Sequence, residues 1–152
     1  MKRNLTTKYI LIFIILTAML LCVGGCNNNT TVPNEIELSL KNDTLTPTGI
    51  TLIITNNSST YDFVYGADYG IETYTNEQWQ EVPALNDHVV FTIAYIIHPN
   101  SSKDFKIDWN YIYGELPQGD YRIVKKFNKV EAFDDISDVI SSQVLYYYFS
   151  ID

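Results

Sequence analysis

Hydrophobic and polar residues alternate along much of the chain after residue 34, with the period of two that is typical of half-buried β-strands. Aliphatic residues share one face of segment 35–41, and the alternation recurs in segment 50–55. Segment 143–151 repeats it with aromatic residues. Because successive side chains of a strand point to opposite faces, each of these segments predicts a strand with one face turned to a core.

Further strands are predicted where short β-branched and aromatic segments lie between turn residues. Gly70–Tyr74 and Trp79–Val82 flank residues 75–78 and predict a hairpin with a four-residue loop. Val89–Ile97, nine residues long, predicts a strand buried on both faces. The remaining predicted strands are 61–66, 103–109 and 121–127.

The segment before the last strand, 132–141, has a different pattern. Phe133, Ile136, Val139 and Ile140 have helical spacing. The segment is therefore predicted to be either a short helix or an acidic loop. Roughly eight short strands separated by turns predict an all-β sandwich.

The stretch 107–127 is predicted to run strand, turn, strand. Within it, Leu116, Gly119 and Tyr121 have the spacing Leu-x-x-Gly-x-Tyr. This spacing resembles the tyrosine corner of immunoglobulin-like sandwiches, in which a tyrosine hydroxyl bonds to backbone a few residues upstream. The three residues are predicted to form a structural corner that joins strands without a disulfide.

Three blocks of sequence carry a resemblance to a known family. They are 47–58, 79–83, and 98–109 together with 113–125. Together they resemble the bacterial immunoglobulin-like domain of lipoproteins and surface proteins of Gram-positive bacteria. Asn100 departs mildly from the family, because such turns often carry glycine. The resemblance implies an immunoglobulin-like fold and a cell-surface setting, and it supplies no catalytic residues.

The first 25 residues have the layout of a secretory signal, with basic residues followed by the apolar run 9–23 and two glycines. That run is shorter than the roughly 20 residues that a spanning helix needs. The following Cys26 completes a resemblance to a bacterial lipobox, in which Val23 replaces the preferred leucine. Cys26 is therefore predicted to be lipidated, and the alternative is an uncleaved N-terminal anchor.

This layout predicts a lipoprotein signal peptide (1–25), a polar tether (26–34) and a β-sandwich (35–152). The predicted location is the extracytoplasmic face of the cell membrane, where the lipid on Cys26 holds the protein.

Charge narrows the range of partners. The chain has a formal net charge of −8, and since three of its cations precede residue 26 and no acid does, the remainder carries −11. Such a domain is repelled by nucleic acid and by anionic headgroups, so no nucleic-acid partner is expected. The only cysteines are Cys22 and Cys26, so neither a disulfide nor thiol catalysis is expected in the mature domain.

Catalytic chemistry is not predicted. The imidazoles are His88 and His98, and no serine lies in a Gly-x-Ser-x-Gly motif. The acidic sequences Asp87-His88 and 134–138 lack the spacing of zinc or EF-hand sites. Weak Ca²⁺ binding at 134–138 stays open beside the simpler interpretation as a solvated acidic loop. No cofactor, no metal and no enzymatic activity are expected.

Aromatic residues are the most informative set for binding. Most are predicted to be core: Trp109, Tyr121, Phe127, Tyr147 and Phe149. Tyr146 and Tyr148 share the opposite face of the last strand, and Tyr74 and Trp79 belong to the hairpin. These four residues form the candidate binding surface, because interfaces use exposed tyrosine and tryptophan. The alternative is that they are ordinary strand residues.

The leading hypothesis is a non-enzymatic binding or interaction module whose partner is an envelope protein or a cell-wall component. The alternative is a protease inhibitor or a regulator of an envelope protein. A flat aromatic patch would favour the first, and an exposed loop containing proline would favour the second.

Overall fold

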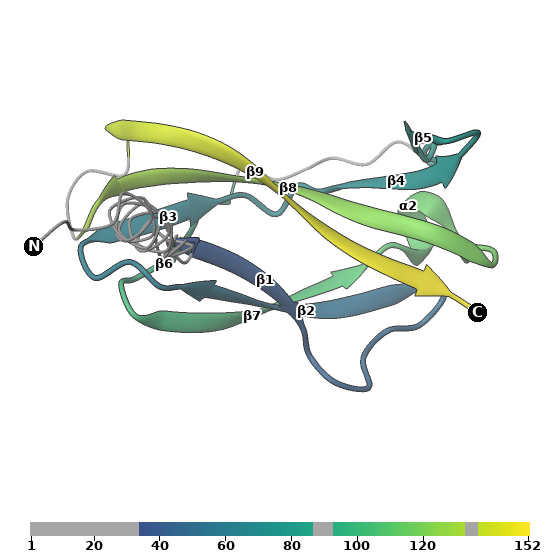
Figure 1. Ribbon diagram of the computed structural model, residues 1–152, viewed down its shortest axis with the longest axis horizontal. Helices are drawn as coiled ribbons and strands as arrows, with labels where there is room; N and C mark the ends of the chain where they lie inside the picture. The colour runs from purple at the N-terminus through teal and green to yellow at the C-terminus, as the bar shows by residue number, and fades with distance from the viewer. Residues whose placement is uncertain (1–33, 87–92, 133–136) are drawn as a thin grey trace, which may run out of the picture. The chain divides into compact units, whose positions relative to one another are not determined.

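The computed structural model describes residues 34–86, 93–132 and 137–152. These described residues form two antiparallel sheets and one short helix, α2 (Asn110–Tyr113) (Figure 1). The strands are β1 (Ile36–Leu40), β2 (Gly49–Asn56), β3 (Tyr61–Tyr65), β4 (Gly70–Thr75), β5 (Gln78–Glu81), β6 (Tyr95–Ile97), β7 (Ser101–Asp108), β8 (Gly119–Glu131) and β9 (Val139–Ile151). The predicted all-β sandwich is confirmed.

The smaller sheet has the order β1-β2-β7. Its central strand alternates between half-buried and buried residues along its whole length, and the buried aliphatic residues are Ile50, Leu52 and Ile54. The predicted period of two is therefore confirmed here, because only one face of the strand meets the core.

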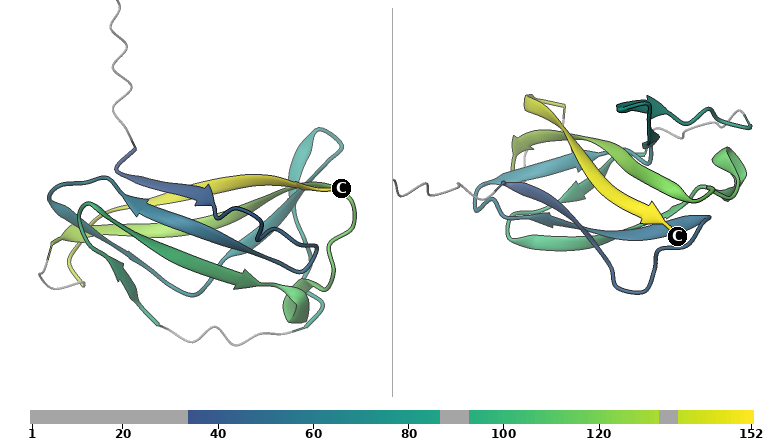
Figure 2. Two further views of the ribbon diagram at one scale, coloured as in Figure 1. Left: turned by 90° about the horizontal axis from the view of Figure 1, so that it is seen from below. Right: turned by 45° about the vertical axis from the view of Figure 1, so that its right-hand side comes forward.

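The larger sheet is organised by β8. β9 pairs with β8 from Gly119 to Val130, and β4 and β3 pair with successive parts of β8 along its other edge. β5 extends the sheet beyond β4, and β6 extends it beyond β3. Among the described strands β9 pairs with β8 alone, so it is an edge strand of thirteen residues (Figure 2).

The core consists of two clusters of buried side chains. The first contains Trp109, Tyr121 and Phe149, together with aliphatic residues from both sheets. The second contains Phe63 and Phe127 with further aliphatic residues. These clusters lie within the unit from Pro33 to Asp152, which is compact by itself. A domain of this size buries enough apolar surface to fold alone.

The β4–β5 hairpin corrects the predicted loop length. Thr75 pairs with Gln78, so the loop has two residues, Asn76 and Glu77, and not four. Both have positive φ, 52° and 62°. Two consecutive left-handed residues are typical of a type I′ turn, whose twist matches that of the flanking strands.

The prediction of a strand buried on both faces over Val89–Ile97 is wrong for its described part. Only β6, residues 95–97, is a strand there, and Ile93 and Tyr95 are 47% and 39% exposed. Among the described strands β6 pairs with β3 alone, so it lies at the edge of the larger sheet. Residues 89–92 lie outside the described residues.

Two further segments differ from the predictions. Val139 and Ile140 belong to β9, so a helix over the whole of 132–141 is wrong, and residues 133–136 lie outside the described part. The predicted turn within 107–127 contains a helical turn, α2, which directly follows Trp109. Asn100 adopts a φ of 52°, a conformation that asparagine tolerates in place of glycine.

The corner residues lie where the two sheets are joined. Tyr121 Oη donates to the carbonyl of Pro117 at 2.8 Å. The carbonyl of Pro47 accepts from Trp109 Nε1 and from the backbone N–H of Leu116, both at 2.8 Å. Leu116 is buried. A Cβ at Gly119 would touch the Tyr121 ring at 3.4 Å, an ordinary contact, so close packing alone does not require glycine there.

Residues 1–33, with Cys26 and the predicted signal, lie outside the described residues. Among the helices of the described part, none has the length and apolar character needed to cross a membrane.

Candidate functional site

Strand β8 sends neighbouring side chains to opposite sides of the larger sheet. Tyr121 and Ile123 are buried in the core, whereas Arg122 is only half-buried. In the register of the sheet, Arg122 lies between Glu72 on β4 and Tyr148 on β9. The guanidinium therefore stands at the centre of the outer face, with a carboxylate on one side and aromatic rings on the other.

Aromatic rings surround this guanidinium. Its central carbon lies 4.6 Å from the centre of the Trp79 ring and 4.2 Å from that of Tyr146. The Tyr148 ring is 6.0 Å away. At these distances the negative face of each ring attracts the cation, and the planar guanidinium can stack on it.

The four predicted surface residues form one contiguous group. Ring centres are 5.1 Å apart for Tyr74 and Trp79, 5.4 Å for Trp79 and Tyr148, and 6.5 Å for Tyr146 and Tyr148. The three tyrosines are 44–56% exposed. We call the four rings and Arg122 the aromatic face. Its rings are held by one another and by Arg122, and much of their surface stays open to solvent.

Glu72 fixes the charge at the centre of the aromatic face. Arg122 Nε donates to Glu72 Oε2 at 2.5 Å. Burial works against the charged form of Arg122, but its bonds to Glu72 and to Tyr148 outweigh this effect and raise its pKa. Arg122 therefore stays charged, and its charge is already balanced by Glu72.

A groove of about 440 Å³ opens beside Trp79. Asp120 and Ser150 supply polar groups, and the rest of the lining is aromatic: Tyr74, Trp79, Tyr121, Tyr148 and Phe149. Ser150 Oγ donates to Asp120 Oδ1 at 2.7 Å. A groove with aromatic walls and a few polar groups at fixed positions is typical of a ligand site.

Sequence reasoning missed Arg122, Glu72 and Asp120. The available signal was alternation: Arg122 stands between two residues that face the core, so a strand here must turn its cation outward. The partners of Arg122 could not be read in this way, because they depend on the register of three strands.

Lys125 was also missed, and it lies in the core, 1% exposed. Its Nζ donates to the carbonyl oxygens of Gly66, at 2.7 Å, and Asp68. It lies 5.0 Å from the centre of the Phe105 ring. Burial lowers the pKa of Lys125, and the nearby carboxylate of Asp68 partly opposes this shift. These contacts link the loop after β3 to β8, and we assign them a structural role.

The catalytic and metal candidates are placed as follows. His98 Nδ1 lies 2.9 Å from Oδ1 of the buried Asp62, which ties the turn after β6 to β3. His88, Asp87 and most of the 134–138 sequence lie outside the described residues. Within 34–86, 93–132 and 137–152, no three His, Cys, Asp or Glu side chains gather in a way that could hold a metal ion.

A family model described as a bacterial Ig-like domain matches residues 32–139. The chain belongs to this family. The match spans β1 to β8 and ends where β9 begins, so Tyr146 and Tyr148 lie beyond the matched residues. No curated protein and no solved structure matches the chain. Membership in the bacterial Ig-like family indicates a non-enzymatic surface or interaction domain.

Proposed function

We propose that this protein is a membrane-anchored lipoprotein of the extracytoplasmic face whose Ig-like domain binds an envelope partner and catalyses no reaction. The signal layout of residues 1–25 and the following Cys26 support lipid anchoring. The family supports an interaction domain. The binding surface we propose is the aromatic face.

The observation that carries the proposal is the open, contiguous ring cluster around a cation that is already paired. A single exposed aromatic residue is ordinary on a protein surface, whereas a contiguous apolar group marks an interaction site. Tryptophan, tyrosine and arginine are also the residues that dominate binding energy at protein interfaces. Here all three types meet in one cluster that joins strands β4, β5, β8 and β9.

The aromatic face is also preorganised. Arg122 is stacked between Trp79 and Tyr146 and bonded to Glu72, so these side chains have lost much of their freedom before any partner arrives. Ordering rotamer-rich side chains costs about 0.5–1.5 kcal/mol each on association. A surface that is ordered beforehand avoids most of this cost.

A second candidate function, protease inhibition or regulation, is favoured by a separate observation. Leu85 is 69% exposed and follows Pro83 by two residues. Its backbone N–H donates to the carbonyl of Ile112 at 2.7 Å, and Asn86 Nδ2 donates to that of Tyr111 at 2.7 Å. An exposed loop segment held at two points is what an inhibitor presents. We rank protease inhibition second because this loop presents one large exposed side chain, whereas the aromatic face presents four.

A crosslinking pull-down separates the two candidates. The unit Pro33–Asp152 serves as bait against an envelope extract. Trp79→Ala and Tyr148→Ala should lose the captured partner, while Leu85→Ala and the exposed control Tyr111→Ala retain it. Loss with Leu85→Ala alone, and recovery of a protease by the unchanged bait, would reverse the ranking.

The anchor has its own test. Cys26→Ala should release the protein into the medium or stop its processing. Unchanged membrane fractionation together with unchanged size would contradict lipidation at Cys26.

A further inference from the structure

We propose that the groove beside Trp79 accepts a cationic side chain, lysine or arginine, from a basic peptide segment of the partner. This inference rests on the proposed function, because it names the chemistry that the aromatic face recognises. Three features of the described residues support it: the charge around the groove, the rings that line it, and the carboxylate of Asp120 in its wall.

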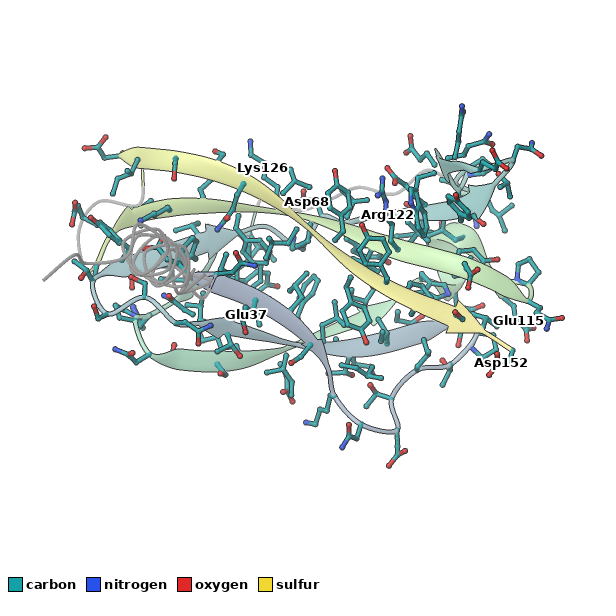
Figure 3. The ribbon with its side chains drawn as sticks, in the orientation of Figure 1. Glu37, Asp68, Glu115, Arg122, Lys126 and Asp152 are labelled. Atoms are coloured by element: carbon teal, nitrogen blue, oxygen red, sulfur yellow. The ribbon has the colours of Figure 1, made fainter. Side chains whose placement is uncertain are left out.

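The charge around the groove is strongly acidic. Besides Arg122 and Glu72, which balance each other, Asp120 lines the groove, and the β4–β5 turn, β5, the loop before β8 and the residue after β9 carry further acidic side chains. These further residues are Glu77, Glu81, Glu115 and Asp152. Figure 3 shows Arg122, Glu115 and Asp152 toward one end of the domain, while Lys126 lies toward the other. A basic segment is therefore attracted to this end, and an acidic segment is repelled.

The rings are suited to a cation. Arg122 already lies over Trp79 and Tyr146, which shows that ring faces in this cluster can hold a guanidinium. The groove opens on another part of the same cluster, where Tyr74, Trp79 and Tyr148 meet solvent. A cation from a partner would find ring faces there and could also rest its aliphatic stem on them.

Asp120 supplies the counter-charge. It lies in the groove wall, and its Oδ1 accepts only a neutral hydroxyl bond from Ser150 among the contacts on the described residues. Glu72, by contrast, is neutralised by Arg122. A carboxylate that faces aromatic rings can pair with a lysine or arginine head, and the same carboxylate opposes an anionic ligand.

The test is a titration of the unit Pro33–Asp152 with a fluorescein-labelled hexalysine peptide, followed by anisotropy and by tryptophan emission. Trp109 is fully buried and Trp79 is not, so a change in emission on binding reports on the groove. We expect saturable binding that quenches Trp79 and weakens at least tenfold between low and high salt, since exposed charge pairs are screened. Tetra-N-acetylchitotetraose, a neutral oligosaccharide, should have no effect.

The decisive comparison uses two variants that each remove one negative charge. Asp120→Asn should weaken hexalysine binding about threefold to fivefold, the effect of losing one exposed ion pair. Glu37→Gln on β1, an exposed site in the smaller sheet, should leave it unchanged. Equal effects of the two variants would mean non-specific attraction to an acidic protein and would overturn the proposal.

Other outcomes also decide the matter. Absence of hexalysine binding, or quenching by tetra-N-acetylchitotetraose in its place, would overturn the proposal of a cationic ligand. If the aromatic-face variants still lose the partner in the pull-down, that result would leave the proposed binding function standing. If they retain the partner, both proposals fail together.

Discussion

Two groups of aromatic side chains lie on opposite faces of the sheet at strand β8. One group is buried in the core, and the other is exposed to solvent. On the inner side, Trp109 and Tyr121 each stack on Phe149 with ring centres 5.6 Å apart. On the outer side, the aromatic face surrounds Arg122, the residue next to Tyr121. The same residue types therefore serve as core on one side of the pleat and as an open surface on the other.

The two groups also differ in the hydrogen bonds that their polar atoms make. Inside, the indole N–H of Trp109 and the hydroxyl of Tyr121 both donate to backbone carbonyls, those of Pro47 and Pro117. These bonds commit the polar atoms to the fold. Outside, the tyrosines are about half exposed: the Tyr146 ring contacts Arg122, and the Tyr74 and Tyr148 rings contact Trp79. We infer that the inner group stabilises the sandwich and that the outer group is available for binding.

The largest expected effect comes from the inner tryptophan. Trp109→Ala should destabilise the domain by about 3–5 kcal/mol, because it removes a fully buried ring and leaves the Pro47 carbonyl with one bond fewer. The matched outer change, Trp79→Ala, should cost about 1 kcal/mol or less. Urea denaturation of both variants measures the contrast, and similar losses of free energy would remove the distinction between the two groups.

Removal of a single tyrosine hydroxyl should show the same difference between the inner and outer groups, with a smaller loss of free energy of unfolding. Tyr121→Phe should reduce the free energy of unfolding by about 1 kcal/mol or somewhat more, since it leaves the Pro117 carbonyl without its partner. It should leave partner capture unchanged. Tyr146→Phe, on the outer face, serves as the matched control, with almost no loss of stability. An unchanged free energy of unfolding for Tyr121→Phe would mean that the corner contributes little to the stability of the fold.

Alkaline pH should weaken the domain through its inner tyrosines. Burial, together with Tyr113 and Asp108, raises the pKa of Tyr69 to about 12 from the ordinary value of 10. The folded state then keeps a proton that the unfolded chain loses, so this stabilisation is full below pH 10 and is lost by about pH 12.

The check is urea denaturation from pH 9 to pH 12 on the unchanged domain and on Tyr69→Phe. The variant should show a shallower loss of stability with rising pH. The comparison cancels the opposite contribution of Lys125, whose lowered pKa favours folding as the pH rises toward its ordinary value. Parallel curves would mean that Tyr69 ionises equally easily in both states.

A small change in stability is expected from Arg122→Lys, which keeps the charge and loses the planar stack. It should alter the free energy of unfolding by about 0.5–1 kcal/mol, because a lysine cannot reproduce the stacking and the directed bond to Glu72. Partner capture should fall more clearly than stability does. Full capture by this variant would show that charge alone, without the ordered rings, is sufficient.

Much of the fold could be predicted from alternation alone. The inward residues of β9, from Leu145 to Ile151, were predicted correctly because the period of two leaves only one choice of face. The two-residue length of the hairpin loop could not be predicted from the sequence, because Glu77 adopts a positive φ that is usually met at glycine or asparagine. Helix α2 lacks the usual capping residue, because its N-cap position is Trp109, which makes no side-chain cap bond; the backbone N–H of Asn110 donates instead to Asp108 Oδ1 at 3.1 Å.

The candidate site was predictable only in part. The four aromatic residues could be proposed from their face and their exposure, but two belong to the β4–β5 hairpin and two to β9. What joins them is β8, which pairs with β4 on one side and β9 on the other. Arg122 and Asp120 enter the site through that pairing, and pairing between distant strands depends on tertiary packing that no local pattern encodes.

The most direct test of this account is photocrosslinking from single positions on the full chain in envelope preparations. Tyr148→benzoylphenylalanine puts the crosslinker on the aromatic face, and Tyr111→benzoylphenylalanine puts it at a tyrosine of α2 that is 68% exposed. We expect a discrete crosslinked species from position 148 and none from position 111. A species from position 111 alone, or from neither position, would contradict the assignment of binding to the outer face of β8 and its neighbours.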